Sequence, residues 1–532
     1  MNNQKRTPIS KLCLLAFASL FAHSPSQAAT MHGRVCLDAG TATSCPADAK
    51  GVADVAISNG RQIVRSDADG RYSIEVGDGD TVFAIKPADM SFANRANGLP
   101  RFWQNYAPNG SPKLKYRGIA PSSSLQFDVA LRPLGKVPGA LDMLVFGDPQ
   151  PKSLKDVGYY DRDIVAPLVG RTKARLGISL GDIASDDLSL YPAVNAVTTR
   201  LHQPWLHVPG NHDMDADAGG DAHALDSFRN VFGPDTYAWQ EPQASFIVLD
   251  DVVMTPGKAP GYIGGFRDDQ FAFLQSVLPT LDRSRLLVLS MHIPLFEPTG
   301  KDTFRDTDRE RLFALIKDFS HVLVLSAHSH AQQHWFHDAS TGWHGAQPLH
   351  EYNVGAACGA FWSGVKDAAG IPASTMSDGT PNGYATLHVE ADGRYALAYH
   401  PARDPADTQI GLHAPKVLRK GAYPAWGVYA NMWMGMADTK IEYRVDDGPW
   451  KTMTRVMQPD PALLAENMRD DEASRLRGYD RSPEATPSPH LWRGALPTDL
   501  AVGEHRIEVR AQDRWRGEVS ATTRYRLEDA KP

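Results

Sequence analysis

The sequence predicts an α/β domain flanked on each side by a β-sandwich domain. Between residues 141 and 326, short apolar segments alternate with longer segments that have helical spacing, as in α/β proteins. Before residue 133 and after about residue 404, short strands and frequent turns replace the helices, which is typical of β-sandwiches. A chain of 532 residues is also longer than one hydrophobic core usually serves, so several domains are expected.

The first 28 residues have the pattern of a secretory signal peptide. Three basic residues precede an apolar run from Leu12 to Ala22, and Ser26-Gln27-Ala28 fits a cleavage site. We therefore expect residues 1–28 to be removed and the mature protein to be periplasmic or secreted, with an N-terminal membrane anchor as the alternative. No later segment approaches eighteen consecutive apolar residues, so we expect no membrane span in the mature chain.

The composition is that of a folded soluble protein, with 42% hydrophobic and 22% charged residues. The formal net charge is −7, and no basic tract indicates a nucleic-acid-binding surface. Cys36 and Cys45 flank a polar loop and could pair, because export makes disulfides possible. For the remaining Cys358 we favour the role of a small buried residue.

Residues 31–134 are expected to form the N-terminal β-sandwich. Val52–Ile57 and Tyr72–Val76 alternate between apolar and other side chains, with turns at Asn59-Gly60 and Asp67-Ala68-Asp69-Gly70. This pattern resembles the small transthyretin-like or immunoglobulin-like domains attached to many secreted enzymes. The aspartates of the second turn could bind calcium, but turn formation alone is the interpretation we favour.

Residues 139–404 are expected to form the α/β domain. Helices are predicted at 156–169, 188–201, 268–281 and 308–319. Apolar strands are predicted between them, at 141–146, 176–180, 205–208, 246–249, 286–291 and 322–326. Polar side chains follow five of these strands, and in open α/β sheets the carboxyl ends of the strands form the ligand-binding edge.

The polar side chains at the strand ends include carboxylates, imidazoles and amides but no thiolate. They are Asp148 and Gln150, Asp182, Asn211 and His212, His292, and His328 with His330. Such a set suits Mn, Fe, Zn or Mg rather than a structural zinc, and it is large enough for two ions that share one carboxylate. Two divalent ions can clamp a phosphoryl group and lower the pKa of a bound water.

Residues 405–532 are expected to form the second β-sandwich. Ile441–Val445 reaches a turn at Asp446-Asp447-Gly448, and His505–Ala511 alternates. Residues 458–490 are rich in proline and charge, which predicts a long exposed loop. A helical tail is the alternative for this part of the chain.

Five sequence blocks resemble those of the calcineurin-like metallophosphoesterases in both order and spacing. They are Gly147-Asp148-x-Gln150, Gly181-Asp182, Gly210-Asn211-His212-Asp213, His292 and Ala327-His328-x-His330. The segments at 358–364 and 378–384 and both flanking sandwiches resemble the bacterial secreted subfamily that carries its own N- and C-terminal β-sandwich domains. The resemblance implies an αββα sandwich, in which two sheets are flanked by helices.

The resemblance also implies two metal sites. The first would contain Asp148, Gln150, Asp182 and His330, and the second would contain Asp182, Asn211, His292 and His328. A hydroxide bridging the two ions would attack phosphorus. His212, oriented by Asp213, would stabilise or protonate the leaving oxygen.

Two residues depart from the usual family pattern. Gln150 stands where the family usually has histidine, and an amide oxygen is a weaker and harder ligand than an imidazole. Ala327 stands where the last block usually begins with glycine, which should be a mild change because both histidines after it remain.

The segment 352–384 follows the last block closely enough to lie over the site and choose the substrate. Phe361, Trp362 and Asn382 are the candidate substrate-binding residues, and packing of the aromatic pair against a flanking sandwich is the alternative. The sequence thus predicts a secreted, dinuclear-metal-dependent hydrolase that acts on phosphomonoesters or phosphodiesters. The competing hypothesis is a non-catalytic ligand-binding or surface interaction protein on a degenerate phosphoesterase fold.

Overall fold

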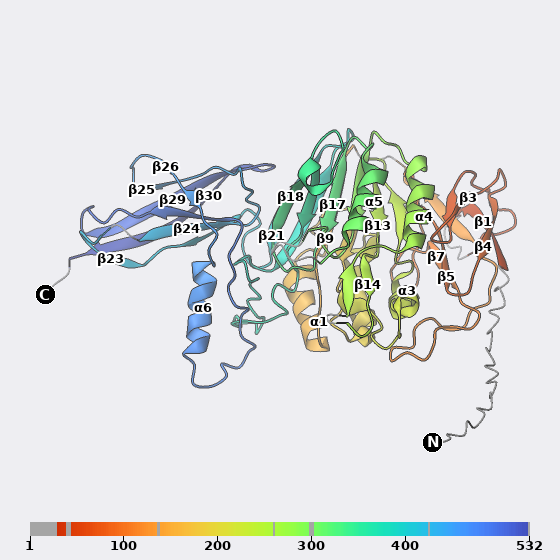
Figure 1. Ribbon diagram of the computed structural model, residues 1–532, viewed down its shortest axis with the longest axis horizontal. Helices are drawn as coiled ribbons and strands as arrows, with labels where there is room; N and C mark the ends of the chain where they lie inside the picture. The colour runs from red at the N-terminus through yellow and green to blue at the C-terminus, as the bar shows by residue number, and fades with distance from the viewer. Residues whose placement is uncertain are drawn as a thin grey trace, which may run out of the picture.

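The structure is a computed structural model in which three parts of the chain follow one another along the longest axis (Figure 1). The N-terminal strands lie at the right of the figure, the α/β part in the middle and the C-terminal strands at the left. The structure describes residues 29–38, 44–135, 139–258, 261–296, 303–423 and 426–529. The expected signal peptide, residues 1–28, lies outside the described residues, so export stays a prediction.

The N-terminal sandwich consists of two four-stranded sheets whose buried side chains belong to one core. The sheet orders are β4-β1-β8-β6 and β3-β2-β5-β7. The strands are β1 (Ala29–Leu37), β2 (Ala56–Ser58), β3 (Ile63–Arg65), β4 (Arg71–Val76), β5 (Asp80–Ala84), β6 (Met90–Phe92), β7 (Trp103–Tyr106) and β8 (Val129–Pro133). Asp67 accepts the backbone N–H groups of Asp69 and Arg71, which is the turn-forming role favoured from the sequence.

The central part contains two sheets, in the orders β11-β10-β9-β20-β21 and β12-β13-β16-β17-β19-β18. The first contains β9 (Leu141–Phe146), β10 (Leu176–Leu180), β11 (Trp205–Val208), β20 (Gly383–Val389) and β21 (Tyr395–Pro401). The second contains β12 (Tyr237–Gln240), β13 (Ala244–Val248), β16 (Leu286–Ser290), β17 (Val322–Ser326), β18 (Gln333–His337) and β19 (Leu349–Asn353), and a separate pair contains β14 (Val252–Met254) and β15 (Tyr262–Gly264). Strands β9, β10 and β11 are parallel, as are β13, β16, β17 and β19, so their carboxyl ends share an edge within each sheet.

The four helices that the sequence predicts are present, with shifted ends. The helices of the central part are α1 (Leu154–Tyr160), α2 (Tyr191–Thr198), α3 (Asp226–Phe232), α4 (Asp268–Val277) and α5 (Asp306–Ile316). A π-helical turn at Asp161–Val165 extends α1, and 3-10 turns at Leu188–Leu190 and Thr199–Leu201 extend α2. Helix α3 is an addition to the prediction.

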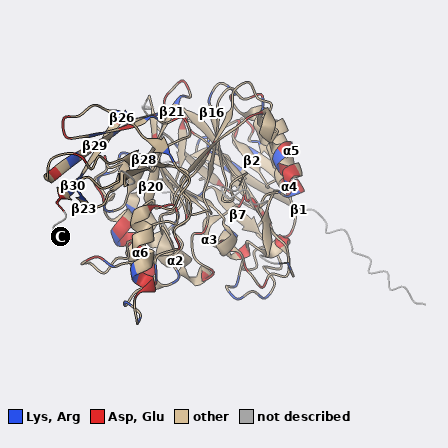
Figure 2. Ribbon diagram, turned by 60° about the vertical axis from the view of Figure 1, so that its left-hand side comes forward, with Lys and Arg blue, Asp and Glu red and all other residues tan. Residues whose placement is uncertain are grey.

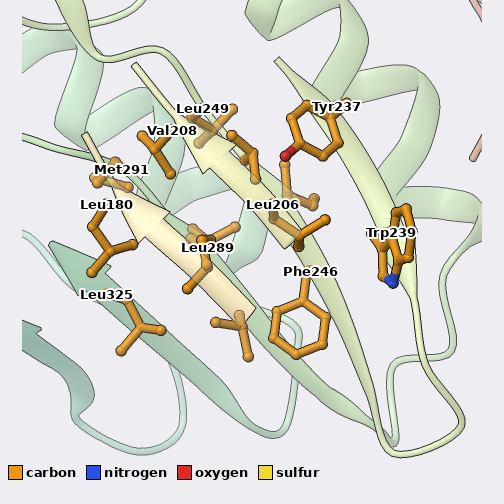
Figure 3. Close-up of a cluster of buried hydrophobic side chains, with 14 of the residues drawn as sticks. Leu180, Leu206, Val208, Tyr237, Trp239, Phe246, Leu249, Leu289, Met291 and Leu325 are labelled. Carbon is orange, nitrogen blue, oxygen red and sulfur yellow. The ribbon is translucent and has the colours of Figure 1, made fainter. Parts of the chain in front are cut away.

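The core between the two central sheets fixes their strand ends relative to each other (Figure 3). Leu180 and Val208 from the first sheet lie among Phe246, Leu289 and Leu325 from the second, and all five are fully buried. Burying a side chain of this kind contributes about 1.5–3 kcal/mol relative to leaving it exposed. The continuous apolar runs seen in the sequence are therefore strands that are covered on both faces.

The C-terminal sandwich has two sheets around its own hydrophobic core. The sheet orders are β22-β24-β28-β27 and β23-β30-β29-β25-β26. The strands are β22 (Ile410–His413), β23 (Val417–Arg419), β24 (Gly427–Met432), β25 (Ile441–Val445), β26 (Lys451–Thr452), β27 (Thr454–Arg455), β28 (Leu491–Ala495), β29 (Gly503–Asp513) and β30 (Gly517–Glu528). The α/β class with β-rich parts on both sides is thus confirmed.

The prediction of an exposed loop over residues 458–490 is wrong in its first part, where helix α6 (Pro461–Asp471) forms. Asp460 caps this helix by accepting the N–H groups of Ala462 and Leu463, and Pro461 occupies the first turn. Figure 2 shows acidic and basic residues on α6, which explains why composition alone indicated a loop. Among the described residues, no helix combines the length and apolar character needed to cross a bilayer.

A disulfide joins Cys36 of β1 to Cys45, as predicted from their spacing. The two Cα atoms are 5.8 Å apart, and the residues are separated by nine positions. Cys358 is free and buried, which is the role favoured from the sequence.

Replacing both Cys36 and Cys45 with serine should lower the free energy of unfolding by about 3 kcal/mol, because the open loop gains conformational entropy in the unfolded chain. Chemical denaturation of the two proteins measures the difference. A reductant should destabilise the wild type and leave the double variant unchanged. Equal stability of the two proteins, or two free thiols in the native wild type, would contradict the prediction.

Candidate metal centre

The predicted donor side chains come together at one edge of the central sandwich. Asp148 follows β9, Asp182 follows β10 and Asn211 follows β11, all in the first sheet. His292 follows β16 and His328 follows β17 in the second sheet. Because the core holds the two sheets face to face, donors that are far apart in sequence lie close together, as Asp148 and His330 do at 3.7 Å.

One group of donors surrounds Nε2 of His292. This nitrogen lies 3.4 Å from Oδ1 of Asp182, 3.1 Å from Oδ1 of Asn211 and 3.2 Å from Nδ1 of His328. The ligand atoms of Asp182, His292 and His328 all lie within 4.8 Å of one another. His292 donates Nδ1–H to the carbonyl of Leu180 at 2.8 Å, which leaves Nε2 as the nitrogen that can bind a metal.

A second group of donors contains Asp148, Gln150 and His330. Oδ1 of Asp148 is 3.7 Å from Nε2 of His330, whose Nδ1–H is donated to the carbonyl of Gly359. Gln150 donates Nε2–H to Oδ2 of Asp182 at 2.9 Å, so its amide lies beside the carboxylate that both groups share. Oδ1 of Asp148 is buried and has no hydrogen-bond partner among the described residues. A bound cation would give this oxygen a partner.

The electrostatics of the site favour bound cations. Burial raises the pKa of Asp148 to about 6, although the neighbouring His330 and His292 lower it. Burial and the charge of His292 lower the pKa of His328 to about 3, so this imidazole is in the neutral form that binds metals. Two carboxylates buried side by side are costly unless positive charge compensates them, and divalent ions do so directly. The donor set therefore fits divalent cations.

The backbone at the strand ends is strained. Eight of the thirteen non-glycine residues with positive φ in the described part of the chain belong to this site, namely Asp148, Gln150, Asp182, Asp186, His328, His330, Phe361 and Trp362. Such conformations cost roughly 1–3 kcal/mol each and persist only where the surrounding structure enforces them. Among them, Asp148, Asp182 and His328 each lie two residues after the end of a strand, β9, β10 and β17 respectively.

Two motif glycines are required because the site is crowded. A Cβ atom at Gly181, where φ is +89°, would lie 2.3 Å from Nδ1 of His292. A Cβ atom at Gly210 would lie 2.2 Å from Oδ1 of Asp182. Both distances are far below a van der Waals contact, so these glycines let neighbouring strand ends approach each other.

His212 lies at the open side of the site. Its backbone N–H donates to Oδ1 of Asp182 at 2.9 Å, and 31% of its side chain is exposed. Its Nδ1 is 2.9 Å from Oδ1 of Asp186. Burial lowers the pKa of His212, but the charge of Asp182 and the hydrogen bond with Asp186 raise it above its ordinary value.

The prediction that Asp213 orients His212 is wrong. Asp213 is fully buried and accepts the backbone N–H groups of Ile183, Ala184 and Gly210, together with the hydroxyl of Tyr191. Its role is to hold the turn after β10 against the turn after β11.

Asp186 makes the contact with the His212 ring that was expected of Asp213. The sequence offers no signal that separates Asp186 from its neighbour Asp187, because the choice depends on the left-handed turn at Asp186. Tyr116 of the N-terminal part donates its hydroxyl to the carbonyl of Asp186 at 2.8 Å. The N-terminal part therefore contacts the loop that carries the partner of His212.

The three candidate substrate-binding residues differ in their surroundings. Phe361 is 42% exposed, and its ring centroid is 4.5 Å from that of His330. The ammonium nitrogen of Lys152 lies 5.1 Å from the same Phe361 ring. Phe361 is thus an exposed aromatic surface beside a candidate metal ligand.

Trp362 and Asn382 are buried, so the prediction that they contact the substrate does not fit their positions. Trp362 donates Nε1–H to the carbonyl of Pro149, and its ring centroid lies 6.2 Å from that of Tyr159. Asn382 donates to Asp163 and to the carbonyl of Ala357. Both residues support the backbone around the site.

Three family models match the sequence, and the central one covers every predicted ligand. "Calcineurin-like phosphoesterase" matches residues 142–332, "N terminal of Calcineurin-like phosphoesterase" matches residues 40–116, and "C terminal of Calcineurin-like phosphoesterase" matches residues 351–518. The chain belongs to the calcineurin-like phosphoesterases. It is therefore a hydrolase of phosphoric ester bonds, in a family that uses divalent metal ions.

Solved structures with related folds are similar to this phosphoesterase only at low sequence identity. A purple acid phosphatase, PPD1, from seeds of yellow lupin (Lupinus luteus) is 11% identical, with a TM-score of 0.37 over 66% of this chain and 68% of that chain. PhoD is 10% identical, with a TM-score of 0.35 over 87% of this chain and 89% of that chain. No curated protein matches the sequence.

Replacing Asp186 with asparagine should lower kcat by about tenfold for alkyl phosphoesters, which need a proton on the leaving oxygen, and less for nitrophenyl esters, which do not. The loss should be smaller than for His212→Ala, because the side chain of Asp186 is 75% exposed and solvent screens its charge. Steady-state kinetics on both ester types measures the effect. The matched control is Asp187→Asn, which removes a neighbouring acid that bonds to Ser189. Equal losses for both esters would contradict the role of Asp186.

Proposed function

We propose that this phosphoesterase uses two divalent ions and hydrolyses phosphomonoesters or phosphodiesters. The observation that carries the proposal is the division of the donors into two groups that share Asp182. Asn211, His292 and His328 form one group, in which Nε2 of His292 lies 3.4 Å from Oδ1 of this carboxylate. Asp148, Gln150 and His330 form the other group. An enzyme with a single ion would have no use for the second group.

The bound ions would supply Lewis acidity toward a phosphoryl oxygen and a water of lowered pKa. The residues of the chain fix the positions of these ions, since the two imidazoles with bonded Nδ1 atoms, His292 and His330, present Nε2 to the site. The buried Asp148 and Asp182 supply negative charge that the ions neutralise. These ions would attract the phosphoryl group of any ester, so the selection among substrates must come from side chains around the site.

His212 is the group that can protonate the leaving oxygen. Asp186 holds its Nδ1, which leaves Nε2 to donate a proton as the ester P–O bond breaks and the alcohol departs. A non-catalytic role, the competing hypothesis from the sequence, has no observation in its favour, because His212 lies beside the shared carboxylate and remains open to solvent.

Protein loaded with manganese should contain about two ions per chain by elemental analysis. Gln150→His should tighten the weaker of the two sites, since imidazole is a stronger ligand than an amide oxygen, as judged by competition with a chromogenic chelator. Asp182→Asn should weaken both sites, because both groups share this carboxylate. Saturation of the wild type at one ion, or an unchanged titration in Gln150→His, would contradict the assignment.

Phe361→Ala should lower kcat/KM more for esters with aromatic leaving groups than for small alkyl esters, because Phe361 offers a ring surface beside the site. Trp362→Phe should instead lower thermal stability with similar losses for all esters, since Trp362 is buried. A panel of phosphomonoesters and phosphodiesters measures both effects. The matched control is Phe336→Ala, which removes a similarly exposed ring elsewhere on the domain. Uniform losses in Phe361→Ala would contradict its contact with the leaving group.

A further inference from the structure

A network of buried polar residues connects the C-terminal sandwich with the turn that carries the candidate metal ligands His328 and His330. Gln332 lies two residues after His330, and its backbone N–H donates to Oδ2 of Asp378 at 2.9 Å. Nε2 of His490, from the C-terminal sandwich, lies 3.1 Å from the same carboxylate oxygen. The residues Gln332, Asp378 and His490 are all buried, with at most 2% of their surface exposed.

Within the C-terminal sandwich, hydrogen bonds hold this network through His490 and Asn431. Nδ1 of His490 lies 2.6 Å from Oδ1 of Asn431, which is on β24. Asn431 donates Nδ2–H to the carbonyl of Asp378 and to the side chain of Asp460, each at 3.0 Å. Asp460 is the residue that caps α6. Asn431 of β24 therefore holds the imidazole of His490, and Asp460 at the start of α6 holds Asn431.

Within the central part, hydrogen bonds also hold the network at Gln332 and Ala331. Gln332 accepts the hydroxyl of Tyr352 at 2.8 Å and the N–H of Gly355 at 3.3 Å. Asn353 donates Nδ2–H to the carbonyl of Ala331 at 2.7 Å. The two residues after His330 are thus held from one side by β19 and from the other side by Asp378.

Gly379 shows how closely the two parts approach each other. Its φ is +85°, and a Cβ atom there would lie 2.4 Å from Cβ of Asp460 and 2.6 Å from Nδ2 of Asn431. This contact accounts for the turn at 378–383, which stands out in the sequence but contributes no ligand to the site. At this turn the central part contacts the C-terminal sandwich directly.

We propose that His490 and Asp378 are positioning residues of the metal centre, so that the C-terminal sandwich is a structural part of it. His328 and His330 both have positive φ, and a strained turn needs support from its surroundings to keep that conformation. Asp378 supplies this support through the backbone of Gln332, and the ring of His490 contacts the same carboxylate oxygen of Asp378. The inference rests on the proposed metal-dependent function.

Replacing His490 with alanine should weaken manganese binding by about tenfold or more, the effect typical of residues that orient metal ligands. His490→Gln should restore most of the affinity, because its amide can still donate to Asp378. Competition with a chromogenic chelator measures the affinity, and thermal unfolding of the metal-free protein measures stability separately. The matched control is His505→Ala, which removes a buried histidine of the same sandwich that bonds to Asp446.

His505→Ala should lower the Tm without changing the metal affinity. Unchanged affinity in His490→Ala, or an equal loss in His505→Ala, would overturn the inference while leaving the metal site itself intact. A wild type that binds no divalent ion would instead contradict the proposed function.

If His490→Ala does not fold, His490→Asn replaces it, since its shorter amide can reach Asn431 but not Asp378. Affinity equal to that of His490→Gln would then also overturn the inference.

Discussion

The burial of Asp148 and Asp182 next to each other is the constraint on which the rest of the structure depends. Two buried carboxylates repel each other and lose their hydration, so the fold must supply positive charge and hydrogen-bond donors around them. His292 and His330 supply imidazoles, and the backbone of His328 donates to Asp148. One oxygen of Asp148 still lacks a hydrogen-bond partner among the described residues, and divalent ions meet that need.

Meeting this constraint requires strain in the backbone. Five of the candidate ligands have positive φ, namely Asp148, Gln150, Asp182, His328 and His330, and the buried core gives the stability that offsets the strain. The supports reach beyond the central part. Tyr116 of the N-terminal part contacts the loop of Asp186, and His490 of the C-terminal sandwich contacts Asp378. Each flanking sandwich therefore contacts a loop next to the candidate site.

The sequence predicted correctly those features that depend on neighbouring residues in the chain. It did not predict contacts between side chains that are distant in sequence. The strand ends and their donors could be predicted because apolar runs and motif residues are contiguous. Asp186 was missed in favour of Asp213 because adjacency in the chain does not give contact between side chains. Trp362 and Asn382 are buried, although the sequence favoured contact with the substrate. The sequence does not show which side chains of a loop will be covered by other parts of the protein. Helix α6 was missed because its charged composition resembles that of a loop.

The sequence by itself determined the family, the α/β class, the order of the donor residues and the pairing of Cys36 with Cys45. These properties follow from residue type and spacing, which the chain carries before it folds. The tertiary structure alone decided which acid holds His212, which aromatic ring faces solvent and how Asp378 reaches His490. These contacts join residues that are 26 to 112 positions apart, and no local preference specifies them. They arise only when separate sheets pack together and bring distant turns to one edge.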